Sequence, residues 1–175
     1  MRDLEDALKK RSIVAITLIL CLAGTAAVFS QGANPRNTAT LRGGQVTVDY
    51  GSPSSRGRDV LALIVPDSYW RMGADDSTTL DTQIDLRFGE ETVPAGSYLL
   101  LAHFLEAENW ELIISKGVQE GSRPKDTVAI VPYTLEKGHP PVERMKIDLK
   151  EEMGKFTLVL SWGEYTLSAE FSDAS

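Results

Sequence analysis

The pattern that decides the fold runs through residues 80–88, which read Leu-Asp-Thr-Gln-Ile-Asp-Leu-Arg-Phe. Every second residue from Leu80 to Phe88 is apolar or small, and the residues between them are charged or polar. Successive side chains of a β-strand point to opposite faces of the sheet. The alternation therefore predicts a half-buried antiparallel strand with a charged outer face.

The same period of two recurs from Gln45 onward. It predicts strands over residues 46–50, 98–104, 110–114, 145–149, 156–162 and 165–171, with weaker candidates over 60–65 and 128–131. Residues 98–104 are apolar on both faces, as expected of a strand inside a sheet. Pro94-Ala95-Gly96 and Gly163-Glu164 predict tight turns. About nine short strands predict one all-β domain, an antiparallel β-sandwich of jelly-roll-like or barrel-like form.

Residues 1–30 have the composition of a secretory signal helix. Lys9, Lys10 and Arg11 precede an uncharged run of apolar and small residues over 12–29. This order is typical of a signal peptide, and we expect cleavage after Ser30. An uncleaved anchor is the alternative, because about 18 residues nearly cross a ~30 Å hydrocarbon layer. Either way, the rest of the chain is expected outside the cytoplasm: periplasmic, secreted or tethered to the outer side of the membrane.

Residues 31–44 are polar, contain Pro35 and the pair Gly43-Gly44, and show no period. They predict a linker, which leaves residues 45–172 as the β domain. The chain has 25 acidic and 18 basic residues, a net charge of −7. Such a surface repels phosphate backbones and anionic lipids, so nucleic acid is excluded as a partner and membrane contact is expected only through an uncleaved N-terminal segment. Cys21, in the leader, is the only cysteine, so the domain has no disulfide.

Searches for catalytic and metal-binding motifs fail. The sequence contains no nucleophile elbow, zinc-protease helix, phosphate loop or calcium loop. His103 lies in an apolar strand, which predicts a structural histidine, and His139 lies in a loop. The acidic residues around Asp75 and Asp81 are typical of a solvated strand face rather than a calcium site. We therefore predict no metal and no cofactor.

The segment from Tyr50 to Thr79 is the densest in residues suited to binding. Its candidate ligand-binding residues are Tyr50, Ser52, Arg56, Arg58, Trp70, Arg71, Asp75 and Thr79. In one interpretation, Arg71 anchors an anion through its guanidinium and Trp70 forms a stacking wall. In the other, these arginines pair with Asp59, Asp67, Asp75 or Asp76 and pin the loops to the sandwich. We expect the second, with Arg71 buried against a carboxylate.

The same segment resembles the DUF2911 family of uncharacterised secreted bacterial proteins. The matching pieces are Val46–Pro53, Arg56-Gly57-Arg58, Trp70–Ala74 with Thr78-Thr79, Val93–Tyr98, Trp110, Pro141–Arg144 and the alternating Leu158, Leu160 and Trp162. The resemblance covers residues 45–171, and Trp-Arg-x-Gly-Ala is its most specific part. Asp75 departs from the asparagine that the resemblance implies after Gly-Ala. The family implies a leader followed by one β domain and supplies no activity.

These observations predict a non-enzymatic extracytoplasmic domain. It would bind a small ligand or glycan, or serve as a packing module in a surface assembly, with a partner that the sequence does not identify. The alternative is a periplasmic hydrolase that acts on a carbohydrate or an ester. That enzyme would use a pair of carboxylates, or one carboxylate with His103 as the base.

Overall fold

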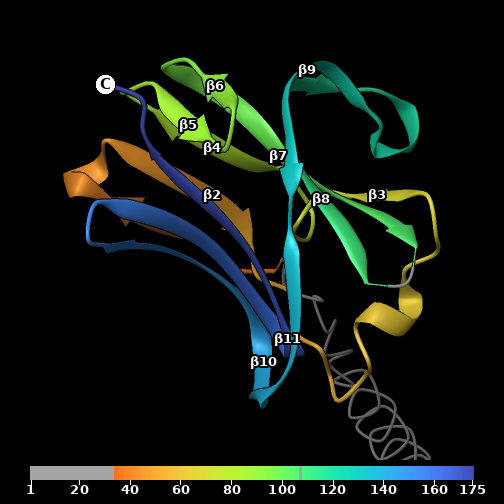
Figure 1. Ribbon diagram of the computed structural model, residues 1–175. Helices are drawn as coiled ribbons and strands as arrows, with labels where there is room; N and C mark the ends of the chain where they lie inside the picture. The colour runs from red at the N-terminus through yellow and green to blue at the C-terminus, as the bar shows by residue number, and fades with distance from the viewer. Residues whose placement is uncertain (1–33, 107) are drawn as a thin grey trace, which may run out of the picture. The chain divides into compact units, whose positions relative to one another are not determined.

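Two β-sheets enclose one apolar core in the computed structural model (Figure 1). The structure describes residues 34–106 and 108–175, and the chain divides after Gly32 into two units, of which the second is the β domain. Its strands are β1 (Arg36–Leu41), β2 (Val46–Gly51), β3 (Ser68–Trp70), β4 (Thr78–Thr82), β5 (Leu86–Phe88), β6 (Glu91–Val93), β7 (Gly96–Glu106), β8 (Asn109–Val118), β9 (Pro124–Pro132), β10 (Thr134–Glu152) and β11 (Lys155–Asp173). Short 3-10 helices are η1 (Arg42–Gly44), η2 (Leu61–Leu63) and η3 (Glu120–Ser122).

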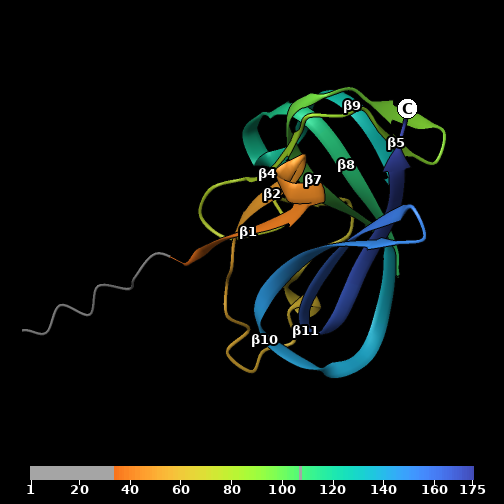
Figure 2. The same ribbon diagram turned by 90° about the vertical axis from the view of Figure 1, so that its left-hand side faces the viewer.

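The larger sheet has the strand order β1-β2-β4-β7-β8-β9, and β3 pairs with β7 beside this path. The smaller sheet has the order β10-β11-β5-β6. Neighbouring strands run antiparallel in both sheets. Figure 2 shows the long strands β10 and β11 curving below β7 and β8. The predicted antiparallel all-β sandwich is confirmed.

The stretch over residues 80–88 crosses from one sheet to the other. Leu80 belongs to β4 of the larger sheet, whereas Leu86 and Phe88 belong to β5 of the smaller one. Thr82 Oγ1 donates to the carbonyl oxygen of Ile84 at 2.7 Å, which stabilises the bend between the strands. The predicted alternation of buried and outward side chains holds, but these residues form two strands instead of the one strand predicted.

The structure differs from the predicted linker over residues 31–44. Residues 36–41 form β1, which pairs with β2 through Gly51 opposite Arg36 and Val46 opposite Leu41. The two glycines that suggested a flexible segment form the turn of this hairpin, with positive φ at Gly43 and Gly44. β1 is an edge strand with mostly exposed side chains, so its sequence lacks the period of a half-buried strand.

Two further local predictions are wrong. The weak strand over residues 60–65 is the 3-10 helix η2 with its flanking residues. The turn expected at Gly163-Glu164 does not form, because β11 continues through Gly163, which has φ +59°. The positive φ is a local irregularity inside a 19-residue strand, at a position where β10 also shows register shifts.

The core is formed by the facing sides of both sheets. Large fully buried side chains include Phe88, Phe156, Leu80, Leu112 and Met145. Strand β7 is buried on both faces, as its apolar sequence predicts, with Leu100 on one side and Leu101 on the other. Leu101 is outside the main core cluster, so β7 also takes part in a smaller apolar layer on the outer face.

The predictions for residues 1–30 lie outside the described residues, as do those for Cys21. Within residues 34–106 and 108–175, no helix has the length and apolar character needed to cross a membrane.

Candidate functional site

The segment from Ser52 to Ser55 is fastened to β10 of the opposite sheet. Ser52 Oγ donates to the carbonyl oxygen of Met145 at 2.7 Å, and the Met145 N–H donates to the carbonyl oxygen of Pro53 at 2.9 Å. The Ser55 N–H donates to the carbonyl oxygen of Glu143 at 2.8 Å. The segment thus serves as a short hydrogen-bonded partner for the free edge of β10.

This fastening places the Glu143 side chain among three donors. The hydroxyl of Ser54 and the N–H of Arg56 (3.0 Å) donate to Glu143 Oε1, and the hydroxyl of Ser55 donates to Oε2 at 2.8 Å. The hydroxyl of Ser54, followed by that of Ser55 and the Arg56 N–H, lowers the pKa of Glu143. Glu143 is therefore a fixed, ionised carboxylate at the surface.

A hollow of about 310 Å³ opens beside this carboxylate, and we call it the Glu143 hollow. One wall is the loop that follows Ser55, and the other is the irregular middle of the β10–β11 hairpin around Gly163. Its lining residues are Ser55, Gly57, Arg58, Asp59, Val60, Pro141, Glu143, Gly163, Glu164 and Tyr165. A Cβ at Gly163 would stand 3.4 Å from Val60 Cγ2, so the two walls are in close contact there.

The lining of the hollow combines one cation, several carboxylates and an aromatic ring. Arg58 donates from Nε to the carbonyl oxygen of Ser55 at 3.1 Å, and its guanidinium forms no ion pair with any described residue. The Tyr165 hydroxyl donates to Asp59 Oδ2 at 3.3 Å. The Lys137 ammonium lies 5.2 Å from the centre of the Tyr165 ring. The hydroxyl of Tyr165 is therefore hydrogen-bonded to Asp59, while its ring attracts the Lys137 cation.

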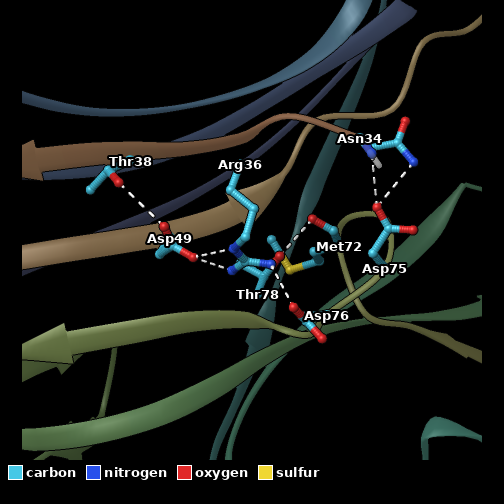
Figure 3. Close-up of polar contacts among 8 residues, drawn as sticks. All are labelled: Asn34, Arg36, Thr38, Asp49, Met72, Asp75, Asp76 and Thr78. Atoms are coloured by element: carbon cyan, nitrogen blue, oxygen red, sulfur yellow. Dashed lines mark hydrogen bonds and ion pairs between the residues drawn. The ribbon is translucent and has the colours of Figure 1, made fainter. Parts of the chain in front are cut away.

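A second group of predicted residues lies around the loop over residues 71–77 (Figure 3). Gly51 on β2 touches this loop so closely that a Cβ there would overlap the carbonyl oxygen of Ala74. A Cβ at Gly73 would in turn stand 3.0 Å from the carbonyl oxygen of Gly51. Thr78 Oγ1 donates to the carbonyl oxygen of Met72 at 2.9 Å and closes the loop. Gly73 and Ala74, the end of the most specific piece of the family pattern, therefore pack backbone against backbone with Gly51.

Charged residues tie the same loop to β1 and β2. Arg36 pairs with Asp49, donating from Nε at 2.7 Å, and its Nη1 lies 4.0 Å from Asp76 Oδ2. Asp75 Oδ2 accepts from the backbone N–H of Asn34 at 3.0 Å (Figure 3). Asp75 has φ +65°, a left-handed conformation that asparagine favours, which explains why the family pattern implies asparagine there. This cluster is a structural clamp between the start of the domain and the 71–77 loop.

The structure divides the candidate residues predicted from sequence between these places. Ser52, Arg56 and Arg58 belong to the loop beside Glu143, and Asp75 and Thr79 lie near the clamp.

Tyr50, Trp70 and Arg71 lie elsewhere. Tyr50 is buried and donates from its hydroxyl to the carbonyl oxygen of Ile147 at 3.3 Å, a bond between the two sheets. Trp70 stacks on Trp162 of β11 with ring centres 5.8 Å apart. Arg71 is exposed and pairs with no described carboxylate. The expectation that Arg71 is buried against a carboxylate is therefore wrong. A clamp exists, but Arg36 forms it.

His103 is held on the outer face of the larger sheet. Its Nδ1 lies 3.0 Å from Glu111 Oε2, its Nε2 lies 3.2 Å from Asp67 Oδ1, and its ring stacks on Tyr69 at 4.2 Å. The side chain is 9% exposed. Both ring nitrogens are occupied, so the arrangement fits the predicted structural histidine and anchors β3 to β7 and β8.

No three His, Cys, Asp or Glu side chains stand together in a way that could hold a metal ion, within residues 34–106 and 108–175. The Glu143 hollow contains Asp59, Glu143 and Glu164, and these do not form such a group.

The family model described as "Protein of unknown function (DUF2911)" matches residues 33–171. The chain belongs to the DUF2911 family. The resemblance stated from the sequence is thus confirmed, and the family match begins before the predicted boundary at residue 45, in agreement with β1. Searches of curated proteins and of solved structures returned no match. DUF2911 membership agrees with the single β domain, and it assigns no activity.

Sequence reasoning missed three residues that organise these sites: Glu143, Tyr165 and Arg36. Glu143 stood in the family piece Pro141–Arg144, and its proximity to Ser54 and Ser55 depends on the pairing of a loop with a strand 88 residues away. Arg36 was assigned to a linker. Only the hairpin of β1 with β2 brings it near Asp49.

Proposed function

We propose that this DUF2911 protein is a non-enzymatic binding domain that works outside the cytoplasm and takes its ligand in the Glu143 hollow. The observation that carries the proposal is the Glu143 carboxylate, fixed by three donors at the border of a hollow of about 310 Å³. A polar group that is already fixed loses little conformational entropy on binding. The volume is at the lower end of the range of small-molecule sites, ~300–1,000 Å³.

The lining carries three carboxylates and one guanidinium, and it favours a small neutral polar ligand such as a sugar. Arg58 offers a guanidinium whose N–H groups can donate to the hydroxyl oxygens of a sugar. Glu143 and Glu164 offer acceptors for hydroxyl groups, and Val60 and the Tyr165 ring offer apolar surface. Such a mixture of an apolar wall and a few polar groups is typical of ligand pockets.

The hydrolase alternative is weakened by His103. A general base needs a free lone pair within reach of the proton that it removes. In His103, Glu111 and Asp67 occupy both ring nitrogens, and the side chain is largely enclosed. A hydrolase would therefore require a different base, and the Glu143 carboxylate is already engaged by three donors.

A thermal-shift screen of the purified protein against sugars, anionic metabolites and divalent ions tests the proposal. A ligand at 100 times its Kd stabilises the folded state by about 2.7 kcal/mol, a shift of several degrees. We expect Arg58→Ala and Glu143→Gln to abolish the shift and Arg71→Ala, a matched exposed arginine, to keep it. Loss of the shift in Arg71→Ala alone would place binding elsewhere and contradict the proposal.

The extracytoplasmic location is part of the proposal and rests on residues 1–30. The basic residues Lys9 to Arg11 and the apolar run after them support export. N-terminal sequencing of the protein from its own host is expected to begin at Gln31. A chain that remains in the cytoplasm with Met1 intact would contradict this location.

A further inference from the structure

The edge strands β6 and β9 come close at one end of the domain (Figure 1). A second groove, apart from the Glu143 hollow, lies there. We call it the β6–β9 groove. It has a volume of about 680 Å³ and runs between β9, the start of β10, the β5–β6 hairpin and the second half of β11. It shares no lining residue with the Glu143 hollow.

The groove borders the apolar core and has one exposed apolar side chain. Phe88, Val131 and Ala169 line it and are almost fully buried in the core. Ile130 on β9 also lines it and is 49% exposed. Few large apolar side chains of the described residues are this exposed, so Ile130 marks a surface at which a partner could remove apolar area from water.

The charge of the groove is of one sign. Glu90, Glu91, Glu136 and Glu170 line it, and no Lys or Arg among the described residues does. Glu170 lies 3.7 Å from Lys155, and Glu136 lies 3.6 Å from His139. Glu90 and Glu91 make no ion pair within the described part of the chain. The groove therefore presents unbalanced negative charge near the exposed Ile130, which complements a cation next to an apolar group.

Both strands that flank the groove are open edges. β9 pairs only with β8 and ends the order of the larger sheet, while β6 pairs only with β5 and ends the order of the smaller one. The backbone groups on the outer side of an edge strand can pair with an added strand. Extended peptides bind many proteins in this way, with alternate side chains entering the adjacent groove.

We propose that the β6–β9 groove binds an extended peptide in which Lys or Arg flanks an apolar residue. The apolar side chain covers Ile130, and the flanking cations pair with Glu90 and Glu91. A second copy of this chain fits less well, because the chain has a net charge of −7 and would bring glutamates against glutamates. The proposal does not depend on the Glu143 hollow.

A pair of synthetic heptapeptides tests the proposal. The probe is acetyl-Thr-Lys-Thr-Ile-Thr-Lys-Thr-amide, whose Lys and Ile side chains share one face when extended, and the control peptide has Glu in place of each Lys. Titrated into the full chain and followed by calorimetry, the Lys peptide is expected to bind and to lose at least tenfold in affinity between about 0.05 and 0.5 M salt. Amide hydrogen exchange in β9 is expected to slow when the peptide binds.

Variants of the protein locate the site. We expect Ile130→Lys and the double variant Glu90→Lys/Glu91→Lys each to weaken binding at least tenfold. Val65→Lys and the double variant Glu108→Lys/Glu120→Lys make the same chemical changes at exposed positions outside the groove and are expected to leave affinity unchanged. Unchanged melting temperatures show that all variants fold.

Several outcomes would overturn the proposal. They are failure of the intact protein to bind the Lys peptide, equal binding of the Glu peptide, and equal loss in the groove and control variants. Dimerisation that Ile130→Lys abolishes, without peptide binding, would make a second copy the occupant.

Discussion

The Ser52 hydroxyl lies 2.7 Å from the carbonyl oxygen of Met145 and donates a hydrogen bond from one sheet to the other. Tyr50, two residues earlier, does the same to Ile147. Both side chains were candidates for ligand binding on sequence grounds. In the structure they satisfy carbonyl groups on the free edge of β10, which fixes the loop that carries Arg56 and Arg58 beside Glu143.

Ser52→Ala is expected to destabilise the domain. Ser52 is 1% exposed, so the substitution leaves the Met145 carbonyl without its buried donor. Such a loss costs about 1–3 kcal/mol of unfolding free energy. The control is Ser97→Ala, which removes an exposed hydroxyl bonded to Asp81 and is expected to stay within about 0.5 kcal/mol. Urea denaturation measures both. Equal effects would show that the Ser52 bond contributes nothing specific.

Gly51→Ala is expected to destabilise the domain, although it adds only one methyl group. The added Cβ would overlap the backbone carbonyl oxygen of Ala74, and a backbone cannot rotate away. Overpacking costs about 1–3 kcal/mol, and more where the neighbour is fixed. Gly117→Ala is the control, because a Cβ there stands 3.9 Å from Lys125. If both variants show the same denaturation midpoint, the close approach of β2 to the 71–77 loop is wrong.

Glu143→Gln is expected to lower the melting temperature in a pH-dependent manner. The hydroxyl groups of Ser54 and Ser55 and the Arg56 N–H hold the pKa of Glu143 below its ordinary value of 4.5. A carboxyl with a lowered pKa contributes stability above its ordinary pKa, and this contribution is lost as the pH falls through the folded-state value. The difference between wild type and variant is therefore largest near neutrality, and it shrinks as the pH falls below 4.5 and through the lower folded-state pKa of Glu143.

Calorimetry over this pH range measures that difference, with Glu120→Gln as a variant that removes an exposed carboxylate elsewhere. A constant difference at every pH would show that the hydrogen bonds do not depend on the charge of Glu143.

Arg36 and Arg71 are expected to differ in their contribution to stability. Arg36 pairs with Asp49 and approaches Asp76, whereas Arg71 is exposed and without a described partner. Arg36→Ala is expected to cost about 0.2–1 kcal/mol, since its side chain is partly exposed. Arg71→Ala is expected to stay within about 0.5 kcal/mol. Thermal melts of the two variants under the same conditions compare them, and a larger loss in Arg71→Ala would contradict the clamp.

The fold could be predicted from sequence wherever a strand buries one face. Residues 156–171 alternate clearly, and they form one side of the core in β11. The alternation of apolar and polar residues does not predict a strand whose side chains are mostly exposed. β1 is exposed on most of its length and is held by pairing with β2, so its residues carry no period. Gly163 looked like a turn because a strand interior rarely needs a positive φ.

The site could be predicted only in part, for a related reason. The sequence placed Ser52, Arg56 and Arg58 in one segment, and the structure keeps them together beside Glu143. The sequence could not show that Arg71 and Asp75 lie in a different place from these three residues. Their position depends on the contact between Gly51 and Ala74, which joins two separate segments of the chain. Distances between segments far apart in the chain are set by sheet topology, which the local pattern does not encode.

The most direct test of the proposed binding function is a fragment screen by two-dimensional NMR on the 15N-labelled protein. Such a screen detects binding even when the natural ligand is not identified. Sugars are expected to shift the backbone amide signals of Gly57, Arg58, Gly163 and Tyr165, which line the Glu143 hollow. The shifts are expected to saturate and to vanish in Arg58→Ala. Fragments that bind while leaving these four signals unchanged would contradict the assignment of the Glu143 hollow as the binding site.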